Sequence, residues 1–233
     1  MADDWNKSTE RWVTSLFNDL RKKRVELFIE KLGIQPHHRI LDLGSEDGSY
    51  LGSYYPHPEM ITIADIKKEP MVRGVEKYGL GGYKEIDPDG PLPFEDGEFD
   101  AVWCNSVIEH VTVDKGDLEN YDDQRFRAES EAHQQEFARE IARVGKAYFV
   151  QTPYLHFPIE SHSVLPLIHY FGHPTRVWLS RVLKKVWIKQ WSADFLLYNF
   201  DRFRKDFPDA EEIYKERAFG FLKSVIAIRR TSA

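Results

Sequence analysis

The chain has 233 residues, 42% hydrophobic and 14% aromatic, enough to build the core of one domain but too few for two full domains. Its 32 basic and 38 acidic residues give a net charge of −6, which argues against a surface built throughout to bind nucleic acid, and a single cysteine, Cys104, excludes an internal disulfide and a paired-cysteine metal site. Neither a membrane-spanning run of about 18 apolar residues nor a signal peptide is recognisable, so we expect a cytoplasmic protein without a bound metal.

The first part of the chain alternates helical and strand patterns. Apolar residues spaced three to four apart predict a helix over 5–32, which ends at Gly33. The next elements are predicted as a strand over 39–44, a helix over 49–55, a strand over 60–66, a helix over 68–78 and a strand over 83–86. This alternation favours a parallel sheet.

The second part of the chain continues the strand and helix pattern and ends in two strand-like runs. Strands are predicted over 99–105 and 147–151, with a helix ending at Gly145 between them. The acidic stretch 112–131 has seven acids and three bases, which is typical of a solvated surface. Two strand-like runs, 213–219 and 224–229, joined by residues 220–223, predict a closing antiparallel hairpin.

Residues 153–210 no longer show the spacing of strands and are rich in aromatic residues, prolines and histidines. We therefore expect them to form a lid or substrate-side insertion over the ligand site. The whole chain is predicted as one domain, with a helical extension (1–36), a cofactor-binding core (37–152), this insertion and the closing hairpin (211–233).

The loop after the first predicted strand, Asp42-Leu-Gly-Ser-Glu-Asp-Gly48, is the first functional candidate. Gly44 and Gly48 allow the backbone to pass close to a ligand, and the following helix offers free amide donors. About 20 residues later the second strand ends at Asp65, whose carboxylate can accept both hydroxyls of a ribose. Taken singly, the glycines could serve a tight turn and Asp65 could cap a helix.

Several motifs together resemble the class I S-adenosylmethionine-dependent methyltransferases, in the branch that modifies small molecules. The resemblance covers about 38–153 and is carried by Ile40-Leu-Asp-Leu-Gly-Ser-Glu-Asp-Gly48, Asp65, Leu92-Pro-Phe-Glu-Asp-Gly-Glu-Phe-Asp-Ala-Val102 and Ser106-Val-Ile-Glu-His-Val111. It implies an α/β fold with a Rossmann-like, doubly wound sheet of seven strands, mostly parallel with a C-terminal antiparallel hairpin, and S-adenosylmethionine as the cofactor.

The resemblance also implies roles for individual residues. The loop around Gly44 would lie against the methionine part of the cofactor, Asp65 would hold the ribose, and Asp87 would meet the adenine amine, although Asp89 fits almost as well. The full set expected at the cofactor is Asp42, Gly44, Ser45, Glu46, Gly48, Asp65, Ile66, Asp87, Asn105 and Ser106.

Glu46 departs from the family pattern, because that position of the loop is usually glycine. The side chain could point outward and leave the backbone path intact, or intrude and weaken cofactor binding. It supports an alternative function, a non-catalytic binding or scaffold protein on a degenerate methyltransferase fold. A nicotinamide-dependent dehydrogenase is a further alternative, because the loop and Asp65 suit NAD too, but the segment 99–111 disfavours it.

Methyl transfer requires an acceptor held in line with the methyl group, and a base where the acceptor carries a proton. His110, His156 and His162 are the candidate bases, because an imidazole can take up a proton near neutral pH. Other polar side chains expected near the pocket mouth are Glu109, Tyr154 and Glu160. The expected acceptor is a small molecule, and nucleic acid is not favoured.

Residues 176–191 contain five bases, three tryptophans and no acid in an otherwise acidic chain. Their spacing predicts an amphipathic helix that could face an anionic acceptor, a membrane surface or a partner chain. The alternative is a lid helix whose apolar side packs inward while its lysines reach solvent.

Overall fold

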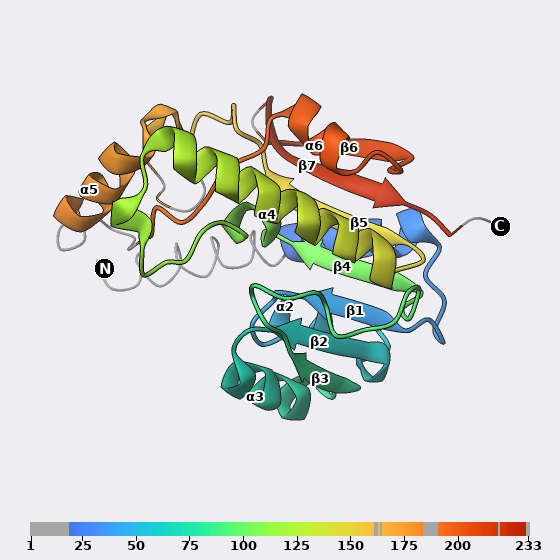
Figure 1. Cartoon of the computed structure of the whole chain (residues 1–233). Helices are drawn as coiled ribbons and strands as arrows, with labels where there is room; N and C mark the ends of the chain where they lie inside the picture. Colours follow the sequence, from blue (N-terminus) through green and yellow to red (C-terminus); the bar gives the residue numbers. More distant parts are fainter. Residues whose placement is uncertain (1–18, 161–162, 164, 184–190, 219, 232–233) are drawn as a thin grey trace, which may run out of the picture.

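The computed structural model describes residues 19–160, 163, 165–183, 191–218 and 220–231. Its sheet has seven strands in the order β3-β2-β1-β4-β5-β7-β6 (Figure 1). The first five strands are parallel, and β7 is antiparallel to both β5 and β6, which confirms the predicted Rossmann-like fold. The strands are β1 (Ile40–Leu43), β2 (Ile61–Asp65), β3 (Gly82–Glu85), β4 (Ala101–Asn105), β5 (Tyr148–Pro153), β6 (Glu212–Ala218) and β7 (Phe221–Arg229).

Helices cover both faces of the sheet because successive strand residues point to opposite sides. Leu41 and Leu43 pack against α4 and α6, whereas Ile40 packs against the helix formed by residues 19–32 and against α2 and α3. The helices are α2 (Ser49–Gly52), α3 (Lys68–Tyr78), α4 (Asp123–Val144), α5 (His173–Leu183) and α6 (Phe200–Asp206), with 3-10 turns η1 (Pro58–Met60), η2 (Ile108–His110), η3 (Leu118–Asn120) and η4 (Ile168–Tyr170).

The described part of the predicted N-terminal helix runs from residue 19 to residue 32, and residues 5–18 of that prediction lie outside the described chain. Gly33 ends it in a left-handed conformation (φ 61°), as expected from glycine's lack of a side chain. Phe28 is fully buried, but Leu20, predicted on the same apolar face, is 45% exposed.

The C-terminal hairpin is tighter than predicted. β7 already begins at Phe221, which pairs with Ala218, so most of the expected connection over 220–223 is strand. The connection therefore shrinks to two residues, of which only Gly220, in a left-handed conformation (φ 81°), is described.

The insertion after β5 lies beyond the carboxyl ends of the parallel strands. In Figure 1 the arrowheads of β4 and β5 point towards the side of the molecule where α5 lies. The last part of the insertion returns to the core, because Phe203 of α6 and Phe207, directly after α6, are fully buried in the core cluster. Within the described residues, no helix combines the length and apolarity needed to cross a membrane.

α5 packs only part of its expected apolar side inward. Val177 is buried together with the polar His173 and Arg176, whereas Trp178 is 60% and Val182 51% exposed. The buried polar side chains have specific partners on α4 and in the segment 193–197, and these partners set the rotation of the helix.

Candidate functional site

The loop between β1 and α2 needs its two glycines for different reasons. Gly44 (φ 78°) and Gly48 (φ 67°) are both left-handed. A Cβ atom on Gly44 would lie 2.4 Å from Val107 Cγ1, and one on Gly48 would lie 2.6 Å from Leu80 Cδ1. The loop therefore fits closely against Val107, which follows β4, and Leu80, which follows α3, only with hydrogen at these positions.

Glu46 leaves the path of this loop intact. It is itself left-handed (φ 63°), and its backbone N–H donates to Asp65 Oδ2 at 2.9 Å. Its side chain turns away and pairs with Lys67 (3.1 Å), both side chains being 60% exposed. Of the two placements considered from the sequence, the side chain adopts the outward one. Glu46 therefore no longer supports a degenerate, non-catalytic fold.

Asp65 ends β2 at the same edge of the sheet and is 8% exposed. Besides Glu46, it accepts a hydrogen bond from the Lys67 backbone N–H (3.1 Å), which leaves further lone pairs on a carboxylate that can accept about four bonds. Ile66 beside it is 47% exposed. Asp65 is thus held rigidly by the loop and can still accept ligand hydroxyls.

The next acidic pair follows β3. Asp87 and Asp89 are both exposed, and the Asp89 backbone N–H donates to Asp87 Oδ1 at 3.0 Å. This turn orders Asp87, and both residues lie beyond the carboxyl end of the third parallel strand, next to the strand that ends at Asp65.

Asp42 lies buried beneath the loop. Burial raises its pKa to about 7, an effect that the Ser45 hydroxyl partly offsets and that the charges of Asp47 and Asp65 reinforce. Neither carboxylate oxygen has a well-formed hydrogen bond to a described residue. A ligand with positive charge near this loop would favour the ionised form of Asp42.

The ends of β4 and β5 form a polar rim that includes an unexpected residue, Arg24. Asn105 and Ser106, both expected at the cofactor, lie beside Gln151, which accepts a hydrogen bond from Ser106 Oγ (2.8 Å). Arg24 of the N-terminal helix donates to Asn105 Oδ1 (2.9 Å) and pairs with Glu216 of β6 at 2.5 Å. Nothing in the sequence pointed to Arg24 or Glu216, which are 192 positions apart.

His110 lies in η2, directly beyond β4, where the insertion meets the core. Its Nδ1 atom is 3.7 Å from Asp194 Oδ2, an ion-pair distance that is longer than a hydrogen bond. Lys115 Nζ is 2.6 Å from the same oxygen. Burial alone would raise the pKa of Asp194, but His110 and Lys115 outweigh it and hold that pKa well below its usual range.

The position of η2 is fixed by buried hydrogen bonds. Gln134 of α4 donates to the carbonyl oxygens of Ile108 (2.9 Å) and Leu196 (3.0 Å), which ties η2 to the segment that carries Asp194. Glu109 is fully buried and accepts a hydrogen bond from Thr152 Oγ1 (3.0 Å), so it lies in the interior and not at the expected pocket mouth.

The other candidates in the insertion are dispersed. His156 is exposed, and its Nδ1 is 2.8 Å from the Tyr170 hydroxyl. Glu160 is buried and accepts hydrogen bonds from Ser163. His162 lies outside the described residues.

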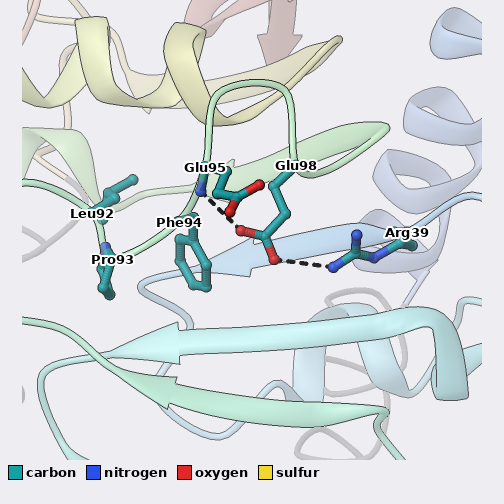
Figure 2. Close-up of a pocket in the computed structure, with 6 residues that line it drawn as sticks. All are labelled: Arg39, Leu92, Pro93, Phe94, Glu95 and Glu98. Carbon is teal, nitrogen blue, oxygen red and sulfur yellow. Dashed lines mark hydrogen bonds and ion pairs between the residues drawn. The ribbon is translucent and has the colours of Figure 1, made fainter.

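A surface hollow at the opposite edge of the sheet does not belong to this site. Figure 2 shows its lining, in which Glu98 pairs with Arg39 (3.0 Å) and accepts a hydrogen bond from the Glu95 backbone N–H. These residues precede β1 and β4, so they lie at the amino ends of strands whose carboxyl ends carry the site. Across the described chain, no group of three histidine, cysteine or acidic side chains could hold a metal ion.

Comparisons with known proteins agree with this geometry. Residues 41–149 match the family model described as a methyltransferase domain. The fold is similar to geranyl diphosphate C-methyltransferase from Streptomyces coelicolor A3(2), at 12% identity and a TM-score of 0.57, covering 94% of this chain and 82% of that one. It is also similar to the PH0226 protein from Pyrococcus horikoshii OT3, at 14% identity and a TM-score of 0.53, covering 88% of each chain. A comparison with curated proteins gave no match.

Proposed function

We propose that this chain, a class I S-adenosylmethionine-dependent methyltransferase, methylates a small-molecule acceptor whose reacting atom carries a proton. The observation that carries the proposal is the pairing of His110 with the buried Asp194 beside the carboxyl end of β4. The family's fold admits a small-molecule acceptor, as in the solved geranyl diphosphate C-methyltransferase.

The cofactor-binding residues follow from the resemblance and from their shared edge of the sheet. Backbone groups of the loop 44–48 would receive the methionine part, with Asn105 and Ser106 beside it. Asp65 would accept hydrogen bonds from the ribose hydroxyls, and Asp87 would accept a hydrogen bond from the adenine amine. When bound, S-adenosylmethionine supplies an electrophilic methyl carbon on a sulfonium, and S-adenosylhomocysteine leaves.

His110 is the proposed proton acceptor. When the acceptor atom takes the methyl group, the proton that it carries would pass to His110 Nε2. Asp194 faces Nδ1, so it orients the ring and stabilises the imidazolium that forms. Lys115 keeps Asp194 ionised and fixed. Asp194 is therefore a positioning residue that acts through His110.

The test measures methyl transfer with wild type and single variants. Panels of phenols, amines and hydroxylated metabolites are screened for release of S-adenosylhomocysteine, and each variant is then assayed on the acceptor found. His110→Gln should lower kcat by roughly 10²–10⁴-fold while cofactor affinity holds. Asp194→Asn should lower kcat by less and leave the cofactor affinity unchanged.

His37→Gln serves as the matched control, because His37 is exposed at the amino edge of the sheet, in the connection before β1, and should behave as wild type. A large loss with His156→Gln and none with His110→Gln would move the base to the insertion. Transfer to RNA or protein, with none to small molecules, would refute the proposed acceptor class.

A further inference from the structure

A polar network at the carboxyl ends of β4 and β5 is organised by Arg24, whose side chain is only 11% exposed. Its Nε atom donates to Glu216 Oε1 (3.2 Å) and its Nη2 atom donates to Glu216 Oε2 (2.5 Å). Glu216 also accepts a hydrogen bond from the Ser224 hydroxyl. Burial alone would raise the pKa of Glu216, but Arg24 and Ser224 outweigh burial and keep that pKa below its ordinary value. The pair therefore stays charged, and its two contacts fix the plane of the guanidinium.

The remaining nitrogen of Arg24 orients two side-chain amides. Nη1 donates to Asn105 Oδ1 at 2.9 Å and to Gln151 Oε1 at 3.4 Å. The Gln151 oxygen accepts a further hydrogen bond from Ser106 Oγ (2.8 Å). A guanidinium has donors and no acceptor, so each amide must turn its oxygen towards Arg24. The NH2 group of Asn105 consequently faces away from Arg24.

Asn105 offers this NH2 group at the edge of the sheet where the cofactor is expected. It is the last residue of β4 and is partly exposed, whereas the four residues before it in the strand are buried. Within the described chain, no group accepts a hydrogen bond from the Asn105 NH2. Gln151 is only 2% exposed, so it belongs to the support of the network. Asn105 is thus a hydrogen-bond donor with a fixed direction.

We propose that the Asn105 NH2 group binds the carboxylate of the amino-acid part of the cofactor, and that Arg24 and Glu216 are positioning residues that hold the amide in this orientation. Where the cofactor binds as in the proposed function, on which this assignment rests, its methionine part lies along the loop 44–48 beside Asn105. That part carries an ammonium and a carboxylate group, and an NH2 group can donate to the carboxylate but not to the ammonium. The fixed amide therefore selects which of the two groups faces the end of β4.

Calorimetric titration with two ligands tests the assignment without requiring methyl transfer. S-adenosylhomocysteine carries the carboxylate, whereas methylthioadenosine has the same adenosine and thioether but lacks the amino-acid part. Asn105→Asp keeps the size of the side chain and an oxygen facing Arg24, but it replaces the NH2 group by a charged oxygen. The dissociation constant for S-adenosylhomocysteine should rise by roughly 10–100-fold, because repulsion replaces a hydrogen bond to a charged group. The dissociation constant for methylthioadenosine should not change.

The double variant Arg24→Met with Glu216→Gln tests the positioning role, because it removes one charge of each sign and leaves Asn105 in place. Without Arg24 the amide can turn its oxygen towards the ligand. Affinity for S-adenosylhomocysteine should therefore fall several-fold while affinity for methylthioadenosine holds, and circular dichroism confirms folding of each variant. Wild-type affinity for S-adenosylhomocysteine in the double variant would overturn the positioning role.

Asn120→Asp is the matched control, because it makes the same chemical change at an exposed residue of η3 and should alter neither affinity. Asp65→Asn separates the assignment from the cofactor placement, because both ligands carry the ribose and both should bind more weakly. If Asp65→Asn has this effect but Asn105→Asp binds S-adenosylhomocysteine as wild type does, or loses affinity for both ligands equally, the assignment is overturned and the placement stands. If Asp65→Asn alters neither affinity, the placement fails and the assignment fails with it.

Discussion

Glu46 adopts a left-handed backbone where glycine is usual, at a cost of about 1–2 kcal/mol. Its N–H bond to Asp65 and its outward pair with Lys67 offset part of that cost. The charge of Glu46 is therefore held at the surface, and the loop keeps the close approach that Gly44 and Gly48 provide.

Asp65→Asn should weaken binding of S-adenosylmethionine by about 1–3 kcal/mol, because a charge-assisted acceptor is lost. The amide NH2 would also face one of the two backbone N–H donors, so the melting temperature should fall by a few degrees. Calorimetric titration measures the affinity. Glu46→Gln is the control, because it keeps the hydrogen bond from the backbone N–H of residue 46 to Asp65. Equal affinity of the two variants for S-adenosylmethionine would remove Asp65 from the site.

Asp42 gives a pH-dependent stability. Its folded pKa of about 7 lies above the ordinary value of 3.8, so the folded state binds more protons than the unfolded state between these values. The contribution of Asp42 to stability is therefore full below about pH 4, falls as the pH rises, and is constant above pH 7. In urea unfolding from pH 4 to pH 8, wild type should lose stability relative to Asp42→Asn as the pH rises to 7, after which their difference should stay constant. A constant difference would contradict the burial of an uncompensated carboxyl group.

The N-terminal helix links both ends of the chain to the rim of the site. Phe28 anchors it against Trp103 (5.1 Å) and Phe149 (5.8 Å), and Arg24 extends from it to Asn105 and Glu216. Arg24 thus connects β6 to the end of β4.

Arg24→Met should destabilise the fold by about 1–3 kcal/mol, because Glu216 is left half-buried without its counter-charge. The double variant Arg24→Met with Glu216→Gln should recover part of this loss. Chemical unfolding of wild type, Arg24→Met, Glu216→Gln and the double variant completes a double-mutant cycle. Additive losses would show that the pair contributes no coupling.

The elements nearest to a regular pattern were predictable, and those set by distant contacts were not. α3 spans 68–78 as its local pattern indicates, and β1 and β2 fall within the apolar runs that predicted them. The rotation of α5 was not predictable, because it depends on Phe126 and Phe195, which are distant in sequence or in an irregular segment. The pattern of a helix gives its two faces but does not say which one the protein covers.

The topology of the whole molecule explains why the candidate cofactor residues share one edge of the sheet. Carboxyl ends of parallel strands meet at one edge, so the loop after β1, Asp65, Asp87 and Asn105 must gather there once the strand order is known. Arg24, Glu216 and Asp194 could not be foreseen, because they reach this edge from elements whose placement follows from tertiary packing. The hollow of Figure 2 lies at the other edge and takes no part.

A crystal structure of the full chain with S-adenosylhomocysteine is the most direct test that this edge binds the cofactor and presents it to His110. We expect the ribose hydroxyls on the Asp65 carboxylate, the homocysteine part against the loop 44–48, and the sulfur facing the side of the site where His110 and Asp194 lie. A ligand bound at the amino edge of the sheet, or one that leaves Asp65 without a ligand contact, would contradict the account.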